Sequence, residues 1–421
     1  MTLLQRLFRR VPPKGPGQAR LALDIGTEYA KALVFETDDD EAARVTGVGR
    51  KRQGLSHMQS GTVADIAAVV ENCRAALLDA EAMSGRACSE VVIGIAGELV
   101  KGFSTTRSIE RKRPDSPVTS AELERLIETI EQEASAEAQQ TITWETGLAN
   151  VDVRLVHATV ASAAIDGYPV TNPVGFQGRH LRMSVFNAYA PLVHLAALES
   201  VVEQLGLALT KVVAEPYAVA RSLVGEQAAQ SGALFIDVGG GTTDIAVVRQ
   251  GSVESTRMFA LGGRAFTKSL ADRLGLSFEE AEEVKIAHAS GEDIDDAEDV
   301  AAIIGEDVAV WAAGVELVLE EFGQEGLLPG RIEVCGGGSA LPEIRAALES
   351  ETFAADLPFA RKPSVSLMTP DEVADVVDET GLLTDQQDVT PMALAYQALE
   401  ASMPQEPLDT ALQRVLRGMR V

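Results

Sequence analysis

The stretch Asp237-Val-Gly-Gly-Gly-Thr-Thr-Asp244 decides the fold of this chain of 421 residues. Apolar runs precede and follow it between Ala233 and Val248, a pattern that predicts two strands joined by a glycine turn. Consecutive glycines let backbone N–H groups approach an anion, because no Cβ blocks the way. A carboxylate at a strand end can hold hydrated Mg²⁺ beside phosphates. The stretch therefore predicts a magnesium–phosphate site, and the alternative is a glycine hairpin that binds nothing.

The same pattern occurs near the N-terminus. Leu21-Ala-Leu-Asp24-Ile-Gly26-Thr27 aligns with Leu234-Phe-Ile-Asp237-Val-Gly239-Gly240. Each unit has an apolar strand, an aspartate, a glycine turn with threonine and a second strand. Two such units predict a duplicated α/β core whose halves face each other. No GxxxxGK[ST] or GxGxxG sequence occurs, which excludes P-loop and Rossmann sites.

A third glycine cluster lies in Val334-Cys-Gly-Gly-Gly-Ser-Ala-Leu-Pro342. A strand ends there, and a helix is expected to begin near Pro342. Upstream, the capping box Ser277-Phe-Glu-Glu280 predicts the start of a helix that carries Glu282 and Lys285 on one face. These two side chains could bind ribose hydroxyls, or they could form an ordinary surface ion pair. The sequence leaves both interpretations open.

Residues 88–190 differ from the two repeated units in the order of their expected strands and helices. They contain a strand, a helix that begins at the capping box Thr119-Ser-Ala-Glu122, and two β-rich runs at 151–165 and 181–189. This order predicts a small α+β module inserted into the duplicated core.

Charge and composition narrow the class of protein. There are 63 acidic and 36 basic residues, a net charge of −27, which argues against nucleic-acid binding. No run of 18 apolar residues occurs, so no transmembrane helix is predicted. Three cysteines without metal-ligand spacing indicate a reducing, cytoplasmic setting. The acidic stretch 271–330 is a candidate partner surface or simply a solvated exterior.

The C-terminus has its own pattern after Pro404 and Pro407. Apolar side chains fall on one arc of a helix and arginines on the opposite arc, which predicts a short amphipathic helix on an anionic membrane surface. The alternative is a helix docked on its own protein. The predicted membrane-contacting residues are Leu408, Leu412, Arg414, Val415, Leu416, Arg417, Met419 and Arg420. The basic N-terminal peptide is a weaker second candidate for membrane contact.

Taken in order over about residues 20–400, these motifs resemble the actin-like ATPase superfamily, which includes actin, Hsp70 and hexokinase. Glu215-Pro216-Tyr-Ala218 resembles its first connecting helix, where relatives carry a water-orienting acid, and Thr390-Pro391-Met-Ala-Leu-Ala395 resembles its second. The resemblance implies an α/β fold: an actin-like (ribonuclease H-like) duplicated ATPase core with an inserted α+β SHS2 (1C) subdomain.

The resemblance also implies a division of the chain. The expected parts are a basic N-terminal peptide and linker at 1–19, subdomain 1A at 20–87 and 191–232, the insert at 88–190, subdomain 2A at 233–275 and 326–369, subdomain 2B at 276–325, a return helix at 370–403 and the amphipathic tail at 404–421.

The implied ligand is ATP with Mg²⁺. Asp24 and Asp237 are expected around the metal, and Glu215 and Asp237 are the candidate catalytic residues. The expected nucleotide-binding residues are Gly26, Thr27, Lys31, Gly239, Gly240, Gly241, Thr242, Thr243, Glu282, Lys285, Gly336, Gly337, Gly338 and Ser339. Such relatives are often poor ATPases, so the rate of hydrolysis stays open.

Within the superfamily the chain most resembles the FtsA family, through the insert and the loop Asn172-Pro173-Val174-Gly175-Phe176-Gln177-Gly178-Arg179. That family implies self-association into filaments and a tether between the tubulin-like ring protein FtsZ and the inner face of the cell membrane. PilM-like pilus-assembly proteins are the close alternative, because they resemble the chain at 1–10 and 274–282; their partner is a peptide of a pilus membrane protein. A small-molecule kinase of the same superfamily would need an acceptor pocket with a catalytic base, for which the sequence shows no candidate.

Overall fold

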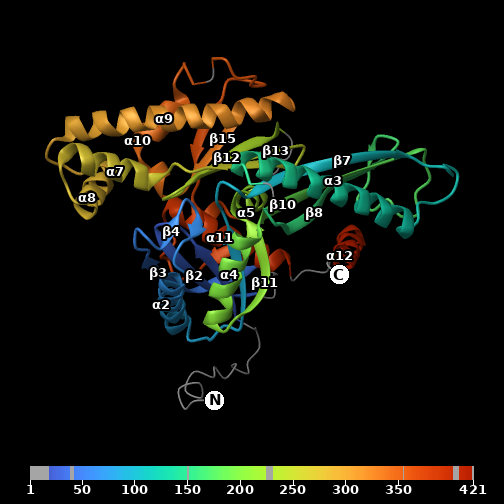
Figure 1. The fold of residues 1–421 in the computed structure, drawn as a ribbon, viewed down its shortest axis with the longest axis horizontal. Coiled ribbons are helices and arrows are strands. Elements are labelled where there is room, and N and C mark those ends of the chain that lie inside the picture. Colours follow the sequence, from blue (N-terminus) through green and yellow to red (C-terminus); the bar gives the residue numbers. More distant parts are fainter. Residues whose placement is uncertain are drawn as a thin grey trace, which may run out of the picture.

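The computed structural model describes residues 19–37, 42–148, 151–223, 231–353, 355–401 and 407–419. The predicted N-terminal peptide up to residue 18, the segment 402–406 and Arg420 lie outside these residues. The described chain forms two lobes, one above the other in Figure 1, and an insert that extends to one side.

The first lobe is built on a six-stranded sheet. Its strand order is β11 (Ala208–Ala214), β6 (Glu90–Ile95), β1 (Arg20–Ile25), β2 (Tyr29–Thr37), β3 (Ala43–Arg52) and β17 (Val376–Asp378). The helices of this lobe are α2 (Ile66–Ser84), α4 (Leu192–Leu205), α5 (Glu215–Ser222) and α11 (Val389–Glu400), and β4 (Met58–Gln59) pairs with β5 (Thr62–Val63). Helix α2 begins directly after Asp65, whose carboxylate caps the N–H of Ala68.

The second lobe repeats this arrangement. Its strand order is β16 (Ser364–Leu367), β15 (Arg331–Cys335), β12 (Ala233–Val238), β13 (Thr243–Arg249) and β14 (Ser252–Phe259). The helices of this lobe are α7 (Gly263–Leu274), α8 (Phe278–Ala289), α9 (Ala297–Gln324) and α10 (Pro342–Glu349), with the short turns η1 (Gly337–Ala340), η2 (Pro370–Glu372) and η3 (Gln386–Asp388) in the loops that follow the strands.

The pairing pattern shows the duplication that the sequence predicts. β1 pairs antiparallel with β2 and parallel with β6, and β12 pairs antiparallel with β13 and parallel with β15. Buried apolar side chains of the two sheets pack against helices in two hydrophobic cores, and the core of the first lobe also includes Val248 and Val253 of the second sheet, which packs against α5. The ends of β1 and β12 therefore meet at the boundary between the lobes.

The insert is an α+β layer made of β7 (Lys101–Glu110), α3 (Ser120–Thr146), β8 (Val153–Ile165), β9 (Tyr168–Pro169) and β10 (His180–Pro191). Its helix begins at the predicted capping box of Thr119 and Glu122. Strand β6 falls inside the range 88–190 but pairs with β1 and β11, so it is part of the sheet of the first lobe.

The insert sheet continues the sheet of the second lobe. β7 pairs with β14 through Ser255–Phe103 and Thr256–Gly102, which extends that sheet to nine strands. A Cβ on Gly102 would lie 2.2 Å from Thr256 Oγ1, so only glycine permits this approach. In sequence the insert interrupts the first lobe, whereas its strands are hydrogen-bonded to the sheet of the second lobe.

The tail forms the helix α12 (Pro407–Met419), which packs against α3 and β8 of the insert (Figure 1). The side chains of Leu408, Leu412 and Leu416 are buried there. The amphipathic helix is therefore present, in the docked arrangement that the sequence left as the alternative. Among the described residues, no helix is long and apolar enough to cross a membrane.

Candidate functional site

A cavity of about 350 Å³ lies between the lobes, and both acidic glycine turns line it. Asp24 is the last residue but one of β1 in the first lobe, Asp237 is the last but one of β12 in the second, and both side chains are buried. The cavity is also lined by Gly26, Thr27, Lys31, Glu215, Gly239, Gly240, Gly241, Thr242, Asp244, Glu282, Lys285, Gly336, Gly337 and Gly338. The duplicated motifs thus meet in one crevice.

The two turns touch each other across the lobe boundary. A Cβ on Gly240 would lie 2.9 Å from the Glu28 Cβ, and one on Gly241 would lie 2.7 Å from Thr27 Oγ1. Any larger residue would push the lobes apart, because contacts below 3.0 Å essentially do not occur for real Cβ atoms. The glycines that the sequence assigns to phosphate contact are therefore also what allows the lobes to close.

Four buried carboxyl groups converge on the cavity. Asp24, Asp237, Asp244 and Glu215 are all less than a tenth exposed. Burial raises the pKa of each of them, and neighbouring carboxylates raise these pKa values further: Asp388 acts on Asp24, and members of the cluster act on the other three. Lys31 counters the effect through its ammonium, whose Nζ lies 3.5 Å from Asp24 Oδ2. The cavity-lining cations Arg264 and Lys285 pair with Glu28 and Glu282, so the carboxyl cluster can accept further positive charge.

The residues present fit a magnesium ion that is held partly by phosphate and water. Asp244 Oδ1 is buried and has no hydrogen-bond partner. In the parts of the chain that the structure describes, no group of three or more His, Cys, Asp or Glu side chains is placed to hold a metal ion directly. Mg²⁺ is usually bound by one or two carboxylates together with waters and substrate phosphates, which agrees with both observations.

Glu215 owes its position to a glycine on the neighbouring strand. It is the first residue of α5 and points toward Gly94 of β6, where a Cβ would lie 2.4 Å from Glu215 Oε1. Burial together with the negative charges of Asp24 and Asp244 raises the pKa of Glu215 well above its usual range. Glu215 therefore holds its proton in the cavity at a pH where an exposed glutamate has lost it.

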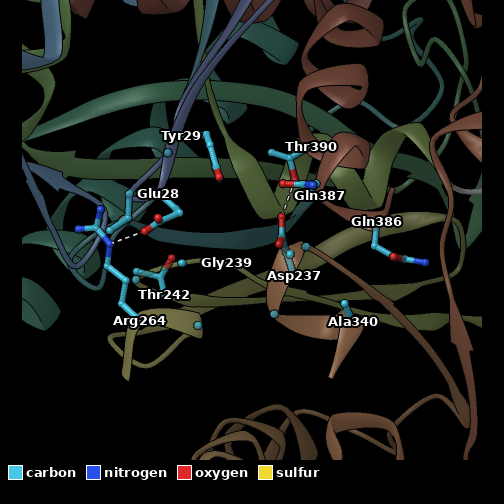
Figure 2. A pocket seen from close by; sticks show the side chains of 18 of the residues that line it. Glu28, Tyr29, Asp237, Gly239, Thr242, Arg264, Ala340, Gln386, Gln387 and Thr390 are labelled. Atoms are coloured by element: carbon cyan, nitrogen blue, oxygen red, sulfur yellow. Dashed lines mark hydrogen bonds and ion pairs between the residues drawn. The ribbon is translucent and has the colours of Figure 1, made fainter. Parts of the chain in front are cut away.

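Asp237, the aspartate of the second lobe, accepts a hydrogen bond from a residue of the first lobe. Thr390 at the start of α11 donates from Oγ1 to Asp237 Oδ2 (Figure 2). The ammonium of Lys31 donates to the backbone carbonyl of Gln387, and the N–H of Gly336 donates to the carbonyl of Gln386 at 3.1 Å. The segment that leads into α11 is therefore bonded to β2 of the first lobe and to the third glycine cluster of the second.

Gly336 opens the third glycine cluster in a conformation that only glycine adopts easily. Its φ is +85°, and a Cβ would lie 2.1 Å from Asp237 Oδ1. Ser339 of this cluster does not line the cavity, because its hydroxyl donates to the Gly336 carbonyl at 2.7 Å. Ser339 thus supports the turn, which differs from the predicted contact with a ligand.

Thr243 also differs from the prediction. Successive side chains of a strand point to opposite faces, so Thr242 and Asp244 face the cavity and Thr243 faces the helices behind the sheet. Thr243 Oγ1 accepts a hydrogen bond from the Trp311 indole at 2.8 Å and donates to the Leu261 carbonyl at 2.8 Å. Its hydroxyl is fully used within the second lobe.

Glu282 and Lys285 lie on α8 at another wall of the cavity. Lys285 Nζ is 2.8 Å from Glu282 Oε2, and both side chains are about nine-tenths buried. The same ammonium donates to the Gly263 carbonyl at 3.0 Å and to Thr267 Oγ1 at 2.8 Å, both on α7. The half-exposed side chain of Ile286 lies beside them and offers an apolar surface to a flat ring. The pair is therefore part of the cavity wall, not of the outer surface.

Two further residues of the cavity had no local signal in the sequence. Arg264 of α7 donates from Nε to Glu28 Oε2 at 2.7 Å, across the lobe boundary (Figure 2). Glu28 also accepts a hydrogen bond from Arg52 Nε at 2.6 Å. Asp244 and Thr390, in contrast, stand inside motifs that the sequence had already singled out, and strand alternation after Thr242 points Asp244 into the cavity.

The tail residues lie far from this cavity, on the insert. Leu408, Leu412, Val415 and Leu416 are buried against it. Arg414 pairs with Glu124 of α3, whereas Arg417 is exposed. The side chain of Met419 and all of Arg420 lie outside what the structure describes.

The sequence of this chain is similar to the sequences of known cell division proteins. Residues 234–382 match the sequence model of the cell division protein FtsA. The FtsA of Pseudomonas aeruginosa is 26% identical over 436 residues, which covers 96% of this chain and 98% of that protein. The FtsA of Neisseria meningitidis is 30% identical over 268 residues, which covers 63% of this chain and 60% of that protein.

Among solved structures, a chain of a PilM-PilN type IV pilus biogenesis complex superposes with a TM-score of 0.63 at 18% identity, and the match covers 91% of this chain and 99% of that one. The chain therefore has the mixed α/β actin-like ATPase fold, with two acidic turns that face each other across one cavity. In sequence, the chain is similar to cell division proteins of the FtsA family, over residues 234–382 for the family model and over nearly the whole length of the Pseudomonas aeruginosa protein.

Proposed function

We propose that the cavity binds ATP with Mg²⁺. The observation that carries the proposal is that Asp24 and Asp237, each at the end of a duplicated strand, line one cavity together with two glycine turns. Backbone N–H groups in such turns bind phosphate oxygens, and buried carboxylates hold a hydrated cation. When bound, Mg²⁺ supplies the positive charge that offsets both the phosphates and the carboxyl cluster.

Each wall of the cavity has a proposed part. Asp24 and Asp237 hold the metal through its waters, and Lys31 contacts phosphate oxygens as a cation. Glu282 and Lys285 contact the ribose, while Ile286 packs against the base. The residues proposed to contact phosphates are Gly26, Thr27, Gly239, Gly240, Gly241 and Thr242, and those proposed beside the adenosine are Gly336, Gly337 and Gly338.

Glu215 is the proposed positioning group for an attacking water. It lines the cavity together with the acidic turns, and burial raises its pKa well above the usual range of a glutamate. Removal of the carboxyl in Glu215→Gln should therefore lower any ATP turnover more than it lowers ATP affinity. Binding, more than turnover, is the expected role of the nucleotide.

At the level of the cell, we propose that the chain acts as an FtsA: it assembles into filaments on the cytoplasmic face of the cell membrane and links an FtsZ-like ring protein to that surface. Its support is the relatives named cell division protein FtsA, one of them matched over nearly its full length. The tail helix supplies the membrane contact, because it combines an apolar face with arginines that attract anionic lipid, at about 1 kcal/mol for each arginine. Flotation with anionic vesicles should be lost when residues 404–421 are removed, while nucleotide binding should be retained.

The nucleotide proposal is tested by titration of a fluorescent ATP analogue with Mg²⁺. Asp237→Asn should weaken affinity at least about tenfold, which corresponds to about 1.4 kcal/mol. Asp79→Asn is the matched control, because Asp79 is an exposed aspartate paired with Lys51 on the outside of the first lobe. Equal affinity of both variants and the parent chain would show that the nucleotide does not bind at Asp237.

A PilM-like role is the second candidate, favoured by the superposition on the chain of the PilM-PilN complex. The two roles are separated by co-sedimentation with FtsZ compared with binding to a short cytoplasmic peptide of a pilus membrane protein. Co-sedimentation with FtsZ filaments is the expected result. Binding of the pilus peptide alone would assign the chain to the second role.

A further inference from the structure

The helix α12 carries its apolar face inward. The side chains of Leu408, Ala411, Leu412, Val415 and Leu416 are each less than a tenth exposed, although the helix lies on the outside of the insert (Figure 1). They belong to one hydrophobic cluster together with the insert residues Val118, Leu123, Leu126, Ile127, Ile130, Ala163, Ile165, Leu181, Met183 and Val185. These five apolar side chains of the tail are thus covered by the insert, where α12 packs against α3 and β8.

Charge also holds the tail in place. Helix α3 is rich in glutamate, and Glu124 Oε1 accepts a hydrogen bond from Arg414 Nη1 at 2.9 Å. A basic amphipathic helix recognises an apolar surface with acidic neighbours in the same way as it recognises an anionic bilayer. The insert therefore presents to α12 both chemical features of an anionic membrane surface.

We propose that the groove between α3 and β8 is a binding site for the chain's own α12, and that an anionic bilayer competes with the groove for the helix. The proposal rests on the proposed membrane contact of the tail. One apolar face cannot be buried in the groove and in lipid at the same time, so the tail must leave the insert before it binds a membrane. In the docked helix, the apolar face that is proposed to bind the membrane is buried against the insert.

Glu124→Lys weakens docking without any change in the tail. The new ammonium faces Arg414, and the repulsion should shift α12 away from the groove. Glu128→Lys is the matched control, because Glu128 is an exposed acid on the next turn of α3 and its replacement changes the net charge by the same amount. General attraction of a more basic protein to the vesicles is therefore equal in the two variants.

The measurement is flotation of the full chain with vesicles of phosphatidylglycerol and phosphatidylcholine in equal parts. We expect Glu124→Lys to bind about fivefold more tightly than Glu128→Lys. Equal binding of the two variants would overturn the competition while leaving the membrane contact itself in place. If no variant floats, the proposed membrane contact fails and the inference fails with it.

A chemical cross-link provides a second test. Glu124→Cys combined with Arg414→Cys places thiols where an ion pair now joins α3 to α12, whereas the native Cys73, Cys88 and Cys335 are buried. A bis-maleimide with a cleavable disulfide should hold the tail docked and abolish flotation, and reduction of the linker should restore it. Flotation of the cross-linked chain at the level of the reduced chain would overturn the inference.

Discussion

Arg264 in the second lobe and Glu28 in the first form an ion pair across the lobe boundary, with 2.7 Å between Nε and Oε2. Both side chains are largely buried, and Arg264 also donates to the backbone carbonyl of Gln53 at 3.2 Å. This contact joins helix α7 to the turn that follows β1, beside the cavity. Opening of the lobes must break it.

The ion pair between the lobes should slow the release of nucleotide. Arg264→Ala is expected to raise the dissociation rate of a fluorescent ADP analogue about tenfold, the equivalent of about 1.4 kcal/mol, because it removes a bond that opening must break. Arg52→Ala is the control: Arg52 also binds Glu28 but belongs to the same lobe. Stopped-flow displacement measures both rates, and equal acceleration in the two variants would contradict the interpretation.

Gly336 should be irreplaceable for nucleotide binding. In Gly336→Ala the methyl group would meet Asp237 Oδ1 at 2.1 Å, so the carboxylate must move and affinity should fall at least about tenfold. Gly381→Ala separates this contact from backbone strain, since Gly381 has a similar positive φ of +68° and no atom near the Cβ position. Calorimetric titration with ATP and Mg²⁺ provides the comparison. A comparable loss of affinity in Gly381→Ala would refute the contact.

Asp244 should destabilise the ligand-free protein at neutral pH. Burial and the charge of Asp237 raise its pKa above the ordinary 3.8, so the free energy of unfolding falls as the pH rises through the raised value. Asp244→Asn removes this loss and should raise the midpoint of thermal unfolding at pH 8, with little effect at pH 3. Thermal unfolding without ligand is the measurement, with Asp79→Asn as control. If Asp244→Asn gained the same stability at both pH values, the raised pKa of Asp244 could not be the cause.

The buried Glu131 of the insert should make the free energy of unfolding depend on pH in a second way. Burial raises its pKa from 4.5 to about 7, and the side-chain amide of Asn187 faces its carboxylate. The folded state therefore loses stability as the pH rises from 4.5 through 7, and Glu131→Gln should be more stable than the parent by about 3 kcal/mol at pH 8 and equal to it at pH 4.

The exposed Glu128 on the same helix provides the control for Glu131, as Glu128→Gln. Unfolding in urea at several pH values gives the comparison. A pH-independent difference between Glu131→Gln and Glu128→Gln would exclude the shifted carboxyl group as the cause.

Local sequence was sufficient for the parts that repeat. The aspartate, glycine and threonine order at Asp24 and at Asp237 predicted two strand–turn–strand units, and β1–β2 and β12–β13 confirm both. The capping boxes at Thr119 and Ser277 likewise marked the starts of α3 and α8. These features depend on residues within a few positions of each other, so a short stretch determines them.

Other features needed the three-dimensional structure. The sequence grouped Thr243 with its neighbours as a phosphate contact, but strand alternation turns it toward Trp311 on α9. Glu28 and Arg264 are separated by more than half the chain, and no local pattern marks either of them. Their pairing depends on how the lobes are packed, which is a property of the whole fold.

The tail shows the same division most clearly. Its spacing of leucines and arginines determined an amphipathic helix, because helical periodicity depends only on neighbouring residues. Which surface covers the apolar face was decided by the tertiary structure, since the groove of α3 and β8 is assembled from segments more than two hundred residues away. The sequence by itself therefore determined the duplicated acidic turns and the helix, whereas packing decided their partners, because hydrophobic burial and charge act between any surfaces that the fold brings together.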